Sequence, residues 1–147
     1  MHHPLLDVSR AKRGRVSAAL SALALGLMAW LRSIDGRLRG PGSEGGIVGL
    51  EFCGRVDACA AQLGAIAGRG EAASLGFSLG LDYAFLAAYS TAIAAAIVFL
   101  VDREASAPRL ARVRGAAIAL AWLQWAAAGF DAVENVALWQ MASGGAA

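Results

Sequence analysis

Two carboxylates and a carboxamide, Asp131, Glu134 and Asn135, lie inside an apolar run near the end of the chain. An ionisable side chain at the centre of a membrane-spanning helix costs roughly 2.5–3.5 kcal/mol on insertion scales, so such groups persist only where other groups satisfy them. Carboxylates in this setting can share a proton, bind a hard cation through oxygen, or act as an acid and base pair. We therefore expect the other helices to be arranged around this cluster.

The composition is typical of a membrane protein. Of the 147 residues, 58% are hydrophobic and 16% are charged, and the mean hydropathy is +0.55; soluble domains usually carry about 25% charged residues. The basic residues are Arg apart from Lys12, and Ala and Gly are abundant, a bias typical of GC-rich bacterial genomes. The net charge of +2, without a basic patch interleaved with aromatic residues, argues against nucleic acid as a partner.

Three apolar runs are long enough to cross a bilayer. The sequence predicts one all-α integral membrane bundle over residues 1–147, with a basic leader at 1–15 and spans at 16–31, 75–101 and 115–141. No small-x-small cleavage site follows the first run, so we expect it to be retained as an anchor. Small residues at every fourth position, as at Ala18, Ala22 and Gly26 and from Gly76 to Ala96, predict close helix packing.

Residues 47–68 are predicted to form one amphipathic helix that is too polar to span the membrane. We expect it to lie on the extracytoplasmic side with its apolar face towards the bundle. Glu51 and Arg55 share its polar stripe at the spacing of an i,i+4 ion pair. The run from Ser43 to Gly46 is expected to supply the N-terminal cap.

The cysteines and histidines do not form a recognisable metal site. Cys53 and Cys59 are six positions apart, which on one helix directs them to different faces, so we expect two buried thiols. A disulfide remains an alternative if the segment is locally irregular. His2 and His3 lie far away at the N-terminus, so we expect no metal, no cofactor and no nucleophile paired with a histidine.

The distribution of basic residues predicts the topology. The leader and the turn at 102–114 are net positive, whereas residues 32–75 contain five Arg and five acidic residues. Because Arg-rich and Lys-rich short loops stay inside, we expect a bacterial inner-membrane protein with a cytoplasmic N-terminus and an extracytoplasmic C-terminus. With a helix rise of about 1.5 Å per residue, this topology places Asp82, Asp131 and Glu134 in one layer of the outer leaflet.

Four interpretations of the polar residues remain open. The first is a structural network that orders the bundle, made by Asp82, Asp131, Glu134 and Asn135 with Tyr89 and Gln124. The second is a proton or cation site, since close carboxylates cannot all stay ionised at low dielectric. The third is a lipid-modifying membrane enzyme, although no catalytic residue can be assigned. The fourth is a scaffold or accessory subunit that pairs with another membrane protein or with itself.

Two short patterns add a resemblance. The run Leu81-Asp82-Tyr83 with Phe85, Tyr89 and Ser90, followed by Asp131-x-x-Glu134-Asn135, resembles a pattern in small multi-spanning bacterial membrane proteins with no assigned activity. The resemblance covers roughly residues 47–140. It implies a membrane location, and it singles out the acidic residues and Asn135, but it implies no mechanism.

Overall fold

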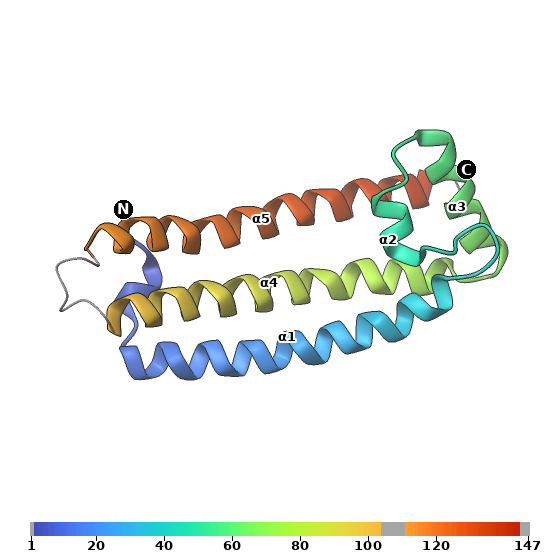
Figure 1. Cartoon of the computed structure of the whole chain (residues 1–147). Helices are drawn as coiled ribbons and strands as arrows, with labels where there is room; N and C mark the ends of the chain where they lie inside the picture. Colours follow the sequence, from blue (N-terminus) through green and yellow to red (C-terminus); the bar gives the residue numbers. More distant parts are fainter. Residues whose placement is uncertain (1, 104–110, 145–147) are drawn as a thin grey trace. The chain divides into compact units, whose positions relative to one another are not determined.

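The computed structural model describes residues 2–103 and 111–144 (Figure 1). This part of the chain is helical almost throughout and contains no strand. The elements are the 3-10 helix η1 (Pro4–Asp7) and the α-helices α1 (Arg10–Leu38), α2 (Gly46–Glu51), α3 (Val56–Gly68), α4 (Ala72–Arg103) and α5 (Ala111–Gly144). Most of the turn predicted at 102–114 lies outside the described residues.

Three of the helices are long and apolar enough to cross a membrane, as predicted. They are α1, the Ala72–Val101 part of α4 and the Val113–Gly144 part of α5. The first helix extends beyond the expected span of 16–31 in both directions, because the flanking sequence contains few helix breakers. Part of the predicted leader is therefore helical, and the helix continues past the expected span to Leu38.

The prediction of one helix over residues 47–68 is wrong. The segment forms α2 and α3, separated by four residues that include Gly54 in a left-handed conformation, with φ of 65°. Cys53 and Cys59 form a disulfide across this break, with their Cα atoms 5.3 Å apart. Six residues of unbroken helix would separate them by about 9 Å along the axis, so the bond requires the interruption.

The chain divides into two compact units, and each long helix contributes to both. The first unit comprises Met1–Gly26 with Phe85–Asp131. Its small core consists of Ala94, Val98 and Ala121, so that α4 and α5 approach closely, with Leu5 and Leu6 of η1 packed against them. The first part of α1 contacts α4, since the Ser17 hydroxyl donates to the Ala92 carbonyl oxygen at 3.1 Å (Figure 1).

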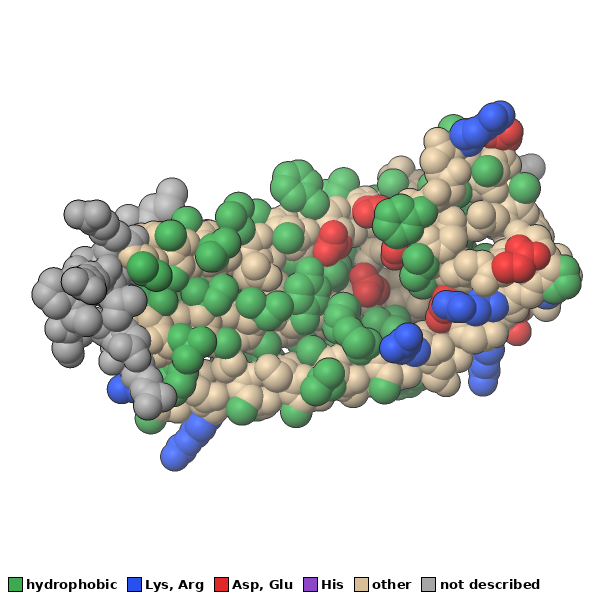
Figure 2. All heavy atoms as spheres, viewed as in Figure 1, with side chains coloured by type: hydrophobic (Ala, Val, Ile, Leu, Met, Phe, Trp, Pro, Cys, Tyr) green, Lys and Arg blue, Asp and Glu red, His purple; other side chains and the backbone are tan. Residues whose placement is uncertain are grey.

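The second unit comprises Leu27–Ala84 with Ala132–Ala147. Its core is built from larger side chains on all five α-helices, namely Leu38, Leu50, Ile66, Leu75, Leu79 and Leu138. Gly76 allows α4 to approach α5 here, because a Cβ at this position would lie 2.7 Å from the Trp139 ring. Charged side chains gather around α2 and α3, whereas apolar side chains dominate the long helices (Figure 2).

The patterns of small residues on α1 and α4 differ in how far they are buried. On α4, Ala88 and Ala92 are buried, as close packing requires, whereas Gly80 and Ala84 are exposed. On α1, however, Ala18, Ala22 and Gly26 are all exposed, and the helix packs through other residues such as Ala24. This face of α1 is therefore open among the described residues, and the predicted approach of another helix to it stays a prediction.

Candidate functional site

In the second unit, a side-chain hydrogen bond joins Asp82 of α4 to Asn135 of α5. The Asn135 Nδ2 atom donates to the Asp82 Oδ2 atom at 2.7 Å. Asn135 is only 6% exposed, while Asp82 is half-buried. The contact joins positions 53 residues apart in the sequence, and it brings together two residues that the sequence singled out.

Tyr83, the residue after Asp82, makes a second polar contact between α4 and α5. The Tyr83 hydroxyl donates to the backbone carbonyl oxygen of Ala132 at 3.2 Å. A groove of about 330 Å³ runs beside this contact, and its lining includes Asn135, Gly80 and Trp139. Asn135 and Tyr83 are thus the polar residues in a groove lining that is otherwise apolar.

In the first unit, Tyr89 and Asp131 form the corresponding pair between α4 and α5. The Tyr89 hydroxyl donates to Asp131 Oδ2 at 3.1 Å. The Tyr89 ring packs against Phe85, with ring centroids 5.0 Å apart. This contact also connects two residues predicted from the sequence.

Two other predicted residues form no polar pair. Glu134 is exposed on α5 and Gln124 is half-buried, and neither has a hydrogen bond or ion pair with a described residue. Asp82 and Asp131 belong to different units, so the common layer of carboxylates stays a prediction. Across residues 2–103 and 111–144, no three His, Cys, Asp or Glu side chains come together in a way that could hold a metal ion.

The polar residues predicted to share one face of a helix over residues 47–68 are arranged differently in the structure. Glu51 is the last residue of α2 and Arg55 precedes α3, so they do not share a helix at i,i+4 spacing. Arg55 instead forms an exposed bidentate pair with Asp57, at 2.9 and 3.1 Å. The guanidinium of Arg55 holds the pKa of Asp57 below its ordinary value.

The connection between α1 and α2 is fixed by side chains that the sequence did not single out. The N-cap residue of α2 is Gly45, within the predicted Ser43–Gly46 run, but it offers no side chain, and Asp35 on α1 accepts the Ile47 backbone N–H at 2.7 Å. Arg69 donates to the Leu38 carbonyl oxygen at 2.7 Å and to the Ser43 hydroxyl oxygen at 2.6 Å. Only the fold brings these residues together, because 26 to 31 positions separate Arg69 from its partners.

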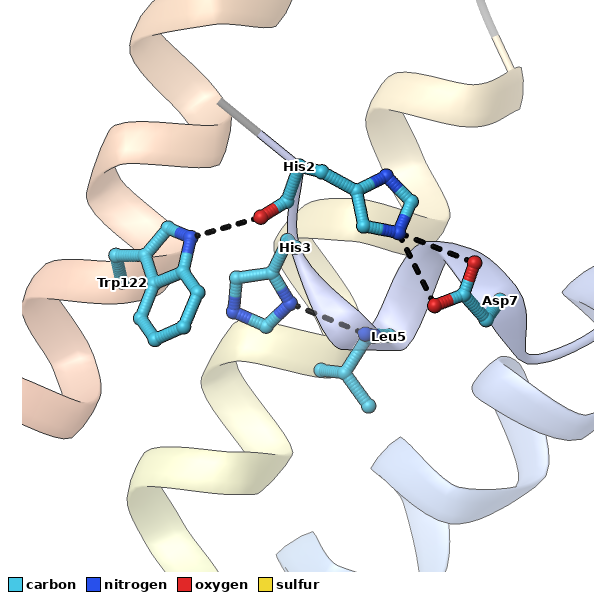
Figure 3. Close-up of polar contacts among 5 residues, drawn as sticks. All are labelled: His2, His3, Leu5, Asp7 and Trp122. Atoms are coloured by element: carbon cyan, nitrogen blue, oxygen red, sulfur yellow. Dashed lines mark hydrogen bonds and ion pairs between the residues drawn. The ribbon is translucent and has the colours of Figure 1, made fainter.

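The N-terminal residues form another arrangement that was missed. His3 is fully buried and accepts the Leu5 backbone N–H through Nδ1 (Figure 3). His2 contacts the Asp7 carboxylate at 3.0 Å, and its backbone carbonyl oxygen accepts from the Trp122 indole at 3.4 Å (Figure 3). The sequence contains both histidines and both tryptophans, Trp122 and Trp125, but the two pairs are some 120 positions apart. No local pattern therefore predicted their contact.

No protein-family model, curated protein or solved structure matches this chain. The chemistry must therefore be read from the residues themselves. Each α4–α5 pair places an acid beside an uncharged donor, a geometry suited to joining two helices and to exchanging a proton. Among the described residues, neither histidine side chain contacts a hydroxyl or a thiol, and we assign no catalytic residue.

Proposed function

We propose that this chain is an integral membrane protein of the bacterial inner membrane whose intramembrane acidic residues organise the bundle and bind a proton or a hard cation. The three long apolar helices support the membrane location. The positive-inside pattern supports a cytoplasmic N-terminus and an extracytoplasmic C-terminus. Membrane lipids are then the immediate partners of the exposed apolar faces.

The observation that carries the proposal is the Asn135–Asp82 hydrogen bond of 2.7 Å. In hydrocarbon, an unpaired carboxyl and an unpaired carboxamide are each costly, whereas together they satisfy part of each other's requirement. Hydrogen bonds between membrane helices contribute on average about 0.6 kcal/mol and up to about 2 kcal/mol. The pair therefore fixes the register of α4 against α5 more than it adds to overall stability.

A proton or a small cation is the ligand that this geometry favours. Each acid accepts a hydrogen bond from an uncharged group, Asp82 from the Asn135 amide and Asp131 from the Tyr89 phenol. A carboxylate in that setting gains from a proton or from a cation bound through oxygen.

A double-mutant cycle tests the organising role. Asp82→Ala, Asn135→Ala and the double variant are compared by SDS-induced unfolding in micelles, with the exposed, unpaired Glu134→Gln as the matched control. We expect a coupling free energy of about 1 kcal/mol between Asp82 and Asn135, and no change for the control. Additive effects of the two single variants would refute the organising role.

The ligand is tested with isosteric variants. Asp82→Asn and Asp131→Asn remove a charge while preserving shape, and thermal unfolding is followed over pH with added Na⁺, Ca²⁺ or neither. A proton or cation site predicts that both variants fold but lose the dependence on pH or cation. If the wild-type protein shows neither dependence, the acids are structural only.

The membrane topology needs its own test. In a Cys53→Ser, Cys59→Ser background, Lys12→Cys and Glu44→Cys introduce labels at exposed positions on either side of the first span. We expect a membrane-impermeant maleimide to label position 44 from outside intact cells and position 12 only after lysis. Labelling of both from the same side would contradict the topology.

A scaffold or accessory subunit is the second candidate, and one observation favours it. The Ala18, Ala22 and Gly26 pattern on α1 is exposed, and Gly26 has open space where a Cβ would lie. Such a face permits close approach of another membrane helix. Ala22→Leu should abolish energy transfer between labelled copies in vesicles if α1 pairs with itself, whereas Ala127→Leu on α5 should not.

A further inference from the structure

His3 lies in an aromatic enclosure within the first unit. Its ring centroid is 5.0 Å from that of Trp122 and 4.7 Å from that of Trp125. The two indole rings meet edge to face at 5.3 Å, and no part of His3 is accessible to solvent. A titratable side chain is therefore held where water cannot hydrate its charged form.

The hydrogen bonds define the protonation state of the docked ring. The Leu5 N–H donates to His3 Nδ1 at 3.2 Å, so Nδ1 must be unprotonated and the neutral ring carries its proton on Nε2. The Nε2 atom is buried, and the Ala121 carbonyl lies near the ring without forming a hydrogen bond of ordinary geometry to Nε2. His3 also serves as the N-cap of η1 through this contact, which ties the state of the ring to the fold of the segment (Figure 3).

We propose that residues 2–7 form a proton-controlled latch, which docks on α5 while His3 is neutral and detaches when His3 is protonated. A second proton can enter the ring only at Nδ1, and it converts that atom from an acceptor into a donor. The Leu5 N–H then loses its acceptor, and the protonated His3 ring is buried where no water hydrates its charge. The indole faces stabilise a cation in part, but they cannot replace the lost cap of η1.

Several charged side chains belong to the same unit as His3. Arg10 lies over the Phe99 ring at 5.2 Å, Arg13 is 4% exposed on α1, and Arg114 of α5 lies beside Leu6. Next to them, His2 and Asp7 form an exposed pair at 3.0 Å. The neighbouring charge that acts on His3 is that of His2, which opposes a further positive charge on the ring.

The sign of the pH dependence follows from burial. Burial lowers the pKa of His3 below its ordinary value of 6.5, His2 lowers this pKa further, and the Ala121 carbonyl opposes the shift in part. Because the docked segment binds the proton more weakly than the released segment, docking is fully favourable above the ordinary pKa and weakens as pH falls below it. A single proton changes the ratio of docked to released forms by at most tenfold per pH unit.

The test uses the full chain in nanodiscs and the indole N–H resonance of Trp122, which reports its hydrogen bond to the His2 carbonyl oxygen. Trp30→Phe and Trp139→Phe remove the two indoles of the second unit. We expect one transition as pH falls from neutral to mildly acidic, with a midpoint below 6.5 and a slope of one proton. Circular dichroism measured in parallel should show that the long helices persist.

Three variants decide the assignment. His3→Asn keeps an acceptor for the Leu5 N–H, and His3→Phe keeps a ring on the Trp pair; both should abolish the transition. His2→Asn is the matched control and should retain it. The proposal is overturned if the wild-type protein shows no transition, if either His3 variant keeps it, or if only His2→Asn removes it, which would assign the effect to the His2–Asp7 pair.

Discussion

In the first unit, the packed residues are Ala94, Val98 and Ala121, and α4 approaches α5 through small side chains. In the second unit, the core consists of Leu and Ile residues, and its connections carry a disulfide and the hydrogen bonds of Asp35 and Arg69. The first unit therefore depends on contacts along long helices. The second must also fix short helices that could not be stable alone, since isolated helices below about 12 residues are marginal.

The difference shows how a chain with three long apolar helices combines two sources of order. Long apolar helices need little beyond lipid and close packing, because their backbone groups are satisfied internally. Short helices such as α2, with six residues, need side chains from elsewhere to cap them. The comparison can be tested by variants that act on one unit, with Trp122 and Trp125 reporting on the first unit and Trp30 and Trp139 on the second.

The largest loss of stability is expected from Gly46→Ala in the second unit. Gly46 has φ of 60°, and a Cβ there would collide with the Asp35 carboxylate that caps α2. Left-handed strain together with the lost cap should cost about 3 kcal/mol, measured by SDS-induced unfolding. Gly36→Ala, where a Cβ meets nothing within 4 Å, is the control and should stabilise helix α1 by about 0.5–1 kcal/mol. Equal effects of the two would contradict the described geometry.

Loss of the disulfide should have the next largest effect. Cys53→Ser with Cys59→Ser is expected to lower stability by about 2 kcal/mol, at the low end of the usual range because the closed loop is short. The fluorescence of Trp30 and Trp139 should change at lower denaturant than that of Trp122 and Trp125. A mass measurement with and without reductant establishes the bond itself, and two free thiols in protein purified without reductant would overturn this expectation.

A smaller effect is expected from Ala121→Val in the first unit. Ala121 is completely buried in the small-residue core, so added methyl groups must push α4 and α5 apart. We expect a loss of about 1 kcal/mol, seen first in the fluorescence of Trp122 and Trp125. Ala127→Val, at an exposed position on the same helix, should be neutral. A loss confined to the second unit would mean that the two units do not report separately.

The smallest effect on stability is expected from Asp57→Asn, which removes the Arg55–Asp57 ion pair. Because Arg55 lowers the pKa of Asp57 below 3.8, the pair stabilises the protein at pH values above 3.8 and is lost as pH falls through the lower, folded-state value. Both side chains are largely exposed, so solvent screens the pair and Asp57→Asn should not change thermal stability measurably at neutral pH. A clear loss at neutral pH would indicate that the α2–α3 region depends on this pair as it does on the disulfide.

The sequence was sufficient for the three long helices and for part of the polar site. Apolar runs and their lengths are sums over neighbouring residues, so α1, α4 and α5 follow from composition alone. Asp82, Asn135, Tyr89 and Asp131 were predictable because polar residues at membrane depth require partners, and the structure pairs them as Asp82 with Asn135 and Tyr89 with Asp131. Glu134 and Gln124 met the same criterion but form no such pair.

Only the tertiary structure decided which face of each helix is buried and where the chain is interrupted. The small residues of α1 are as compatible with packing as those of α4, yet they are exposed. The break before α3 follows from a disulfide and a left-handed glycine, and His3 is buried by two indoles some 120 positions away. Local sequence sets helix formation through short-range energies, whereas burial, capping and protonation depend on neighbours that only the folded chain brings into contact.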